Sequence, residues 1–209
     1  MTTAGSRATS AHADAHPYLF QFLVPLCCNP FGVSASSSMT STLPELRELE
    51  ADASRRGLLL RLQVSHTVGV GALRVGVARR TAGGSLVLLG ELKGWTLPTS
   101  DGLRLDTMRV QGDDTAAVGP LIWAATFAWA LEATPCRRAT LLAIRDNEAQ
   151  HRRLVRYFRR LGFEPRRELG AGVLDLAPRL LWGGAGLLMQ GDCREGLGRS
   201  SQQLRQRGL

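Results

Sequence analysis

The feature that most constrains the fold is one uncharged stretch, "TAAVGPLIWAATFAWAL". It is apolar all round a helical projection, and its length is at the lower edge of a membrane span. Strand-like segments flank it, and Gly119 and Pro120 open it in a way that suits a first helical turn. We therefore expect a helix buried on all sides in a folded core, with the rest of the chain packed around it.

The segment before this helix predicts antiparallel structure. The stretch "LPELRELEADASRRG" has leucines at helical spacing and ends at a glycine, which is typical of a short helix. It is followed by "LLLRLQVSHT", "ALRVGVARRT", "SLVLLGELKGWTLP" and "GLRLDTMRV", which are rich in Val and Leu and separated by turn residues. The expected N-terminal half is a helix followed by an antiparallel run of strands.

After the apolar helix the pattern changes. The run "RATLLAIR" fits a buried strand, residues 147–161 fit a helix, and "FEPRREL" follows. The glycines of "LLWGGAGLLMQGDC" indicate close backbone packing or a last strand with a bulge. A strand, a crossover helix and a second strand imply parallel pairing. The expected fold class is α/β of the mixed α+β kind: a central mixed sheet, antiparallel in its N-terminal half and parallel βαβ in its C-terminal half, with helices on both faces.

The helix 147–161 has two distinct faces. Apolar residues share one arc and five arginines share the opposite one: Arg152, Arg153, Arg156, Arg159 and Arg160. Asn147 and His151 lie in line with the apolar arc, where polar groups need partners from the fold or from a ligand. Asn147 has the position of an N-cap, and a hydrogen-bonded histidine at the core edge is the simpler interpretation of His151.

The ends of the chain differ from its middle. Residues 1–42 hold many Ser, Thr and Ala and few charges, which indicates a transit peptide or a disordered segment. The scarcity of arginine favours a plastid, so the expected localisation is the chloroplast, with the cytoplasm or the mitochondrion as alternatives. A secretory sequence around "YLFQFLVPLCC" is a competing interpretation. Residues 43–192 form the expected domain, and residues 193–209 are expected to be a basic tail.

The formal net charge of +8 comes almost wholly from arginine. Guanidinium groups suit contact with phosphates, whether on nucleic acid, an anionic membrane or a nucleotide cofactor. A solvated basic surface is the simpler explanation for any single arginine. The four cysteines show no metal-binding spacing, so we expect no metal site. We expect no membrane span either.

Three segments carry a resemblance to a known family. "DTMRV" ends a strand at Val110, "DTAAVG" lies between this strand and the apolar helix, and "YFRRLGF" closes the next helix. In this order they resemble the GCN5-related N-acetyltransferase (GNAT) superfamily, most clearly over residues 103–169. That family wraps the pyrophosphate of acetyl-CoA in a loop of pattern Q/R-x-x-G-x-G/A, and its second helix reads N-x-x-A-x-x-L-Y-x-x-x-G-F. The resemblance implies a GNAT-like fold with acetyl-CoA as cosubstrate.

The resemblance also implies where the cofactor binds, and the sequence departs from the family there. The implied cofactor-binding residues are Val110, Thr115, Ala117, Gly119, Arg145, Asn147 and His151. Asp114 replaces the opening Gln or Arg of the loop, and Ala117 replaces its first glycine. An acid beside a pyrophosphate repels it, whereas the backbone N–H groups that bind phosphate remain, except at Pro120. Arg145 lies at a strand end from which it could reach the phosphates.

The catalytic candidates are two carboxylates and a tyrosine. Acetyl transfer to an amine needs a base for the amine and an acid for the departing thiolate. Asp106 and Glu91 are the candidate bases, and alternation along the strand places Asp106, Met108 and Val110 on one face. Many family members use a tyrosine as the acid, but Phe158 holds its position here, so Tyr157, one residue away, is the candidate.

The expected function is therefore acyl-CoA-dependent N-acetylation of an amine: a protein lysine, an N-terminus or a small amine. Two alternatives remain open. One is a GNAT-fold protein that binds a CoA ester without turnover, as Asp114, Ala117 and Phe158 favour. The other is an arginine-rich nucleic-acid-binding protein that uses the arginine face of helix 147–161.

Overall fold

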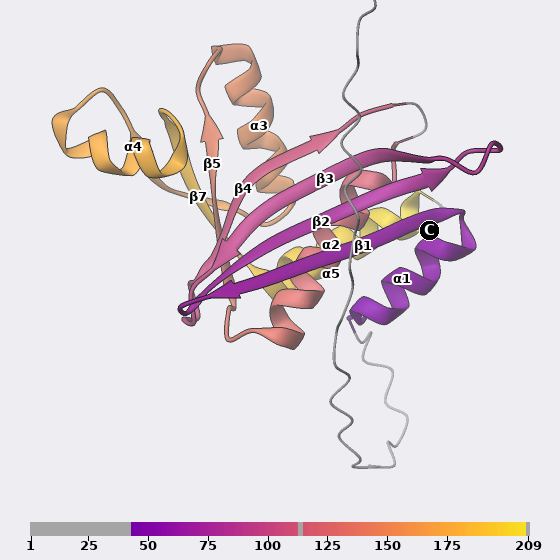
Figure 1. The fold of residues 1–209 in the computed structure, drawn as a ribbon. Helices are drawn as coiled ribbons and strands as arrows, with labels where there is room; N and C mark the ends of the chain where they lie inside the picture. Colours follow the sequence, from indigo (N-terminus) through magenta and orange to yellow (C-terminus); the bar gives the residue numbers. More distant parts are fainter. Residues whose placement is uncertain (1–42, 113–114, 208–209) are drawn as a thin grey trace, which may run out of the picture. The chain divides into compact units, whose positions relative to one another are not determined.

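The computed structural model describes residues 43–112 and 115–207. In this part of the chain seven strands form one sheet in the order β1-β2-β3-β4-β5-β7-β6, and helices pack around it (Figure 1). The expected mixed α/β fold is confirmed, and it is consistent with the GNAT-like sheet that the resemblance implies. The predicted transit peptide and Asp114 of the loop lie outside the described residues.

The N-terminal half of the sheet is an antiparallel meander, as predicted. Its strands are β1 (Leu58–Thr67), β2 (Val70–Arg80), β3 (Leu86–Thr96) and β4 (Leu103–Val110). Along β2 the buried and exposed side chains alternate, with Leu73, Val75 and Val77 facing the core. This period of two places one face of the sheet against helices and leaves the other to solvent.

The C-terminal half contains β5 (Arg138–Ile144), β6 (Glu164–Leu169) and β7 (Gly186–Asp192). Parallel pairing occurs between β4 and β5, whereas the parallel pairing predicted between the two strands around helix 147–161 is wrong. Strands β5 and β6 also run in the same direction, but β7 lies between them and pairs antiparallel with both. The predicted close packing of the last strand is visible at Gly186, where a Cβ atom would lie 2.3 Å from the carbonyl oxygen of Ala143.

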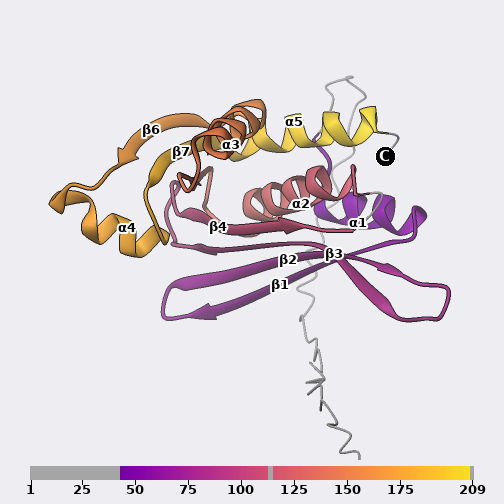
Figure 2. The same ribbon diagram turned by 90° about the horizontal axis from the view of Figure 1, so that it is seen from above.

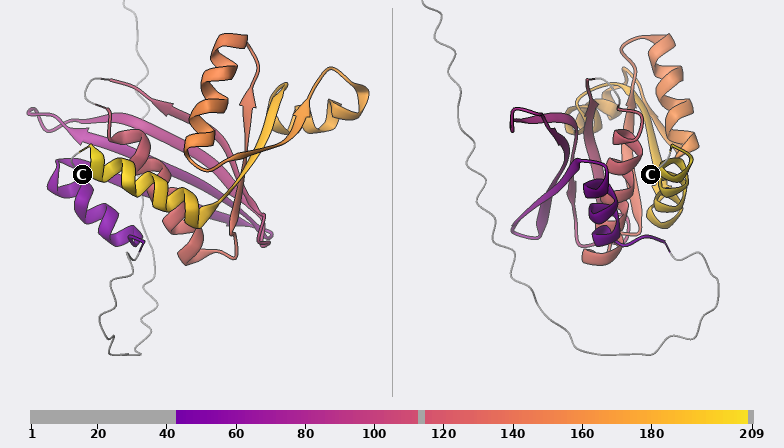
Figure 3. Two further views of the ribbon diagram at one scale, coloured as in Figure 1. Left: turned by 180° about the vertical axis from the view of Figure 1, so that it is seen from behind. Right: turned by 90° about the vertical axis from the view of Figure 1, so that its right-hand side faces the viewer.

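Five helices of the described ranges surround the sheet: α1 (Leu46–Arg55), α2 (Val118–Ala133), α3 (Glu148–Arg160), α4 (Leu176–Trp182) and α5 (Cys193–Gln206), with a 3₁₀ turn at Val173–Asp175. Helix α2 packs on β2, β3 and β4, with α1 beside it, and α3 packs on β5 and β7. The views in Figures 2 and 3 place α5 on the side of α2 away from the sheet. Residues 118–130 of α2 are all buried, which confirms the predicted core helix. On the other face of the sheet, Trp182 of α4 lies against Arg104.

The predicted basic tail is wrong, because residues 193–206 form the packed helix α5. Its buried residues recur at helical spacing and are mostly small: Cys193, Gly196, Leu197, Ser200, Ser201 and Leu204. Gly196 faces the ring of Phe127 on α2, where a Cβ atom would lie 2.6 Å from Cε2. Small side chains allow α5 to approach α2 closely. Because several of them are Gly or Ser, residues 193–206 have the composition of a polar tail, which explains the wrong prediction.

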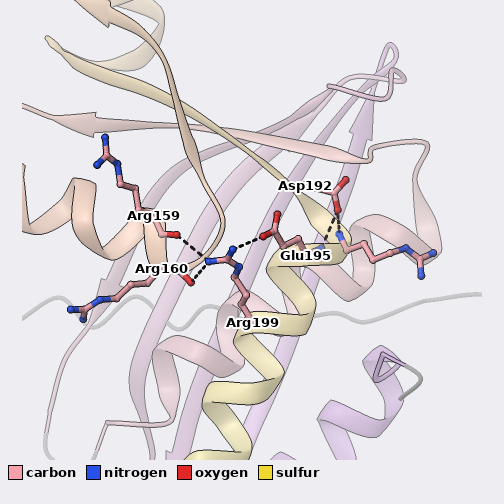
Figure 4. Close-up of polar contacts among 6 residues, drawn as sticks. Arg159, Arg160, Asp192, Glu195 and Arg199 are labelled. Atoms are coloured by element: carbon pink, nitrogen blue, oxygen red, sulfur yellow. Dashed lines mark hydrogen bonds and ion pairs between the residues drawn. The ribbon is translucent and has the colours of Figure 1, made fainter. Parts of the chain in front are cut away.

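Polar contacts cap the start of α5 and join this helix to the end of α3. The Asp192 carboxylate accepts hydrogen bonds from the backbone N–H groups of Arg194 and Glu195 at the start of α5. The guanidinium of Arg199 donates to the carbonyl oxygens of Arg159 and Arg160, at 3.3 and 3.2 Å, where α3 ends (Figure 4). The last carbonyl groups of α3 are therefore satisfied by α5.

Candidate functional site

Strands β4 and β5 separate shortly after they meet. They pair at three positions, Leu103–Leu105 with Ala139–Leu141, and then diverge, as Figure 1 shows. At the same point the register between β3 and β4 shifts, because Leu105 is opposite Gly94 and Thr107 is opposite Lys93. Asp106 is the extra residue of this β-bulge, and a bulge bends its strand. The bend leaves the β5-facing edge of residues 106–110 outside the ladder.

A narrow cleft of about 40 Å³ lies where the strands separate. Strands β3, β4 and β5 and helices α2 and α3 all contribute to its lining: Leu92, Leu105, Asp106, Thr107, Met108, Trp123, Leu141, Leu142 and Phe158. The ring centroids of Trp123 and Phe158 are 6.2 Å apart in an edge-to-face arrangement. The lining is thus apolar apart from Asp106 and Thr107, which both come from the bulge.

The two carboxylates proposed as bases lie in different places. Asp106 lines the cleft together with Met108, at a bulge that interrupts the alternation predicted for Asp106, Met108 and Val110. Glu91 lies on the opposite face of the sheet from Leu92, and it forms ion pairs with Arg74 and Lys93. Only Asp106 is therefore brought to the cleft.

Tyr157 lies beside the start of α2. Its hydroxyl oxygen accepts a hydrogen bond of 2.7 Å from the indole N–H of Trp123. A Cβ atom added to Gly119 would lie 3.8 Å from this hydroxyl and 3.7 Å from Cε of Met108, which lines the cleft. Burial raises the pKa of Tyr157 above 10.0, against the lowering effects of the Trp123 hydrogen bond and the Arg207 charge. The phenol is therefore protonated at neutral pH and keeps its hydrogen for donation.

The loop before α2 offers backbone N–H donors, and the guanidinium of Arg207 lies beside it. The N–H groups of Val118 and Leu121 bond to the carbonyl oxygens of Thr115 and Ala117. Among the described residues no side chain caps this helix, so the N–H of Gly119 points out of its first turn. Arg207, just after α5, donates to the carbonyl oxygen of Ala116. Sequence reasoning missed Arg207 because it lay in the supposed tail.

Three of the implied cofactor residues have structural partners instead. Arg145 lies between two carboxylates, 3.5 Å from Glu148 and 2.5 Å from Glu168. The side chain of Asn147 accepts from the backbone N–H groups at the start of α3, as an N-cap does. His151 is 6% exposed, and its Nδ1 lies 3.2 Å from the carbonyl oxygen of Ile144. The interpretations of Asn147 as a cap and His151 as a core-edge histidine account for these contacts.

Val110 ends β4 opposite Gly90 and is 42% exposed.

Over the described ranges, no group of three or more His, Cys, Asp or Glu side chains is placed to hold a metal ion. In the same residues no helix has the length and apolar composition needed to cross a membrane.

Comparison with known proteins gives a distant structural likeness. No family model matches the sequence, and no curated protein matches it significantly. Among solved structures, the crystal structure of nourseothricin acetyltransferase is similar with a TM-score of 0.39 and 14% identity, over 66% of this chain and 88% of that one. A likeness of this size places the chain in no family, so the function must be argued from the site.

Proposed function

We propose that this chain is an acetyl-CoA-dependent N-acetyltransferase with its cosubstrate between β4 and β5. The separation of these strands after three paired positions carries the proposal. An unpaired strand edge recognises extended ligands through their amide groups, and the pantetheine arm of CoA carries two amides. The apolar lining by Leu105, Trp123 and Leu141 suits the thioester end.

The start of α2 provides the second half of the cosubstrate site. Backbone N–H groups at a helix N-terminus and the helix dipole favour the pyrophosphate. The guanidinium of Arg207 adds a formal positive charge next to Ala116. Arg207 thus takes the role first assigned to Arg145, which two carboxylates already hold.

Two side chains are the candidates for proton transfer. Asp106 is exposed at the cleft and could accept a proton from the incoming amine. Tyr157 is protonated at neutral pH and lies beside Gly119 and Met108, from where it could protonate the departing thiolate. The acceptor would be a protein lysine, an N-terminus or a small amine, in the chloroplast if residues 1–42 are a transit peptide.

A non-catalytic CoA-binding protein is the second candidate, and one observation favours it. The side chain that lines the cleft at the family's tyrosine position is Phe158, which cannot donate a proton. Such a protein would bind the thioester in the same cleft and leave it intact.

Calorimetric titration of acetyl-CoA into the full chain tests both candidates. We expect micromolar binding that Gly119→Asp removes, because the new carboxylate lies beside the pyrophosphate, and that Arg153→Gln on the exposed face of α3 leaves unchanged. Free thiol release with a panel of amines then separates the candidates. Tyr157→Phe should reduce turnover about 100-fold with the dissociation constant unchanged. Binding without turnover supports the non-catalytic protein, and no binding to the folded chain refutes both.

A further inference from the structure

A second and larger concavity, of about 350 Å³, lies on the face of the sheet opposite α2. Four strands contribute its lining residues: Arg104 from β4, Arg138 and Thr140 from β5, Arg166 from β6, and Leu188 and Gln190 from β7. The register explains why they converge, since Thr140 is paired with Arg104 on one side and with Gln190 on the other. We call this the arginine concavity.

Thr140 is the first sign that a ligand belongs here. The residue is 6% exposed, and its hydroxyl has no hydrogen-bond partner among the described residues. A buried hydroxyl without a partner is unfavourable, and native proteins seldom retain one without a reason. Thr140 lines the arginine concavity, so a ligand seated there is a candidate for the missing partner.

The three arginines give the concavity its charge. Arg104 lies over the ring of Trp182, with 5.6 Å from Cζ to the ring centroid, which fixes its guanidinium while leaving its donors available. Within the described part of the chain, the partner of Arg138 is the distant and solvent-exposed Asp101, at 3.9 Å. No acidic side chain is part of the lining.

A bulge directs the third arginine. The register between β6 and β7 shifts between Pro165 and Arg167, so Arg166 is the extra residue. Bulges re-aim side chains, and this one brings Arg166 to the same concavity as Arg104 and Arg138. The lining thus holds three guanidinium groups and no carboxylate, and the long ion pair of Arg138 with Asp101 offsets little of their mutual repulsion, which favours the entry of an anion.

We propose that the arginine concavity binds the phosphate group of a phosphorylated small molecule. Three guanidinium groups and the Thr140 hydroxyl supply more donors than the two oxygens of a carboxylate can accept, and they match the three terminal oxygens of a phosphate monoester. The volume leaves room for a small organic part beside Leu188 and Gln190. The site lies on the other face of the sheet from the proposed acetyl-CoA cleft, and the proposal does not depend on that function.

Titration with inorganic phosphate, with acetate as the carboxylate comparison, tests the proposal on the full chain at low ionic strength. We expect millimolar or tighter binding of phosphate and at least about tenfold weaker binding of acetate. Thr140→Val should weaken phosphate binding about tenfold, which corresponds to one hydrogen bond to a charged group. Arg138→Gln combined with Arg166→Gln should weaken it further. The matched control is Arg152→Gln with Arg153→Gln, which removes the same charge from the exposed face of α3.

Folding and the alternative site are controlled separately. Thr140→Val should melt no lower than the parent, since it removes an orphaned hydroxyl, and the exposed Arg166 can be changed without touching the core. Gly119→Asp should leave phosphate binding unchanged. The proposal is overturned if the folded parent binds no phosphate at about 10 mM, roughly ten times the expected millimolar dissociation constant. It is also overturned if the control pair weakens binding equally, if a folded Gly119→Asp variant no longer binds phosphate, or if acetate binds equally well.

Discussion

The packing of α5 on α2 predicts opposite effects for the same change at two glycines of one helix. At Gly196 a Cβ atom would lie 2.6, 2.8 and 3.0 Å from three ring atoms of Phe127, which is 1% exposed and cannot move aside. At Gly198 the nearest atom is Cδ2 of Leu43, at 3.5 Å, an ordinary contact. Gly196→Ala should therefore destabilise the protein, and Gly198→Ala should stabilise it.

The size of the effect follows from two terms. Replacing glycine by alanine within a helix stabilises by about 1 kcal/mol, and this term is shared by both variants. Forcing an extra methyl group into a packed interface costs about 1–3 kcal/mol, and this term belongs to Gly196→Ala alone. The difference between the two variants therefore isolates the overpacking, at about 1–3 kcal/mol, or roughly 3–9 °C in melting temperature for a chain of this size.

Urea unfolding followed by tryptophan fluorescence would measure this difference, because Trp123 and Trp129 both lie on α2. Calorimetry would give the melting temperatures. Equal stability of the two alanine variants, or a more stable Gly196→Ala, would show that α5 does not pack on α2 as described. The placement of Arg207 at the cofactor loop would fail with it.

Three further predictions concern single groups. Burial raises the pKa of the Cys193 thiol from 9.0 to about 12. The stability that the neutral thiol contributes is therefore present below pH 9 and lost as the pH rises towards 12. The free energy of unfolding should fall by about 1 kcal/mol between pH 8 and 10, and it should fall less in Cys193→Ala. Asn147→Ala should cost about 1 kcal/mol as a lost N-cap without changing acetyl-CoA affinity, and a tenfold weaker affinity in calorimetry would restore a cofactor role. Arg145→Gln should weaken acetyl-CoA binding no more than Arg153→Gln does, and a larger loss would contradict the ion pairs of Arg145.

Much of the fold could be predicted because its signals are local. The uncharged stretch 115–131 requires cover on all sides, and α2 has it. The two arcs of residues 147–161 are also confirmed, with His151 buried and the five arginines exposed. The N-cap of α3 and the strands of the meander depend on neighbouring residues as well, which is why the sequence predicts them.

The features that the sequence did not predict depend on distant residues. The insertion of β7 between β5 and β6 is a matter of pairing, and alternation of side chains carries no information about partners. The bulge at Asp106 is visible only from the register of β3 against β4, and it interrupts the alternation along β4. For α5 a signal existed: Cys193, Gly196 and Leu197 begin a helical period of buried positions, hidden by the small size and polarity of their neighbours.

The burial of α2 on every side also has a consequence for the making of the protein. Its outer side is covered by α5, which follows every strand of the sheet in the chain. A ribosome that has released all seven strands therefore still holds a nascent chain in which the side of α2 that includes Phe127 is uncovered. Until α5 emerges, this surface is open to chaperones and to other nascent chains. The emergence of α5 thus sets the moment at which α2 can be covered.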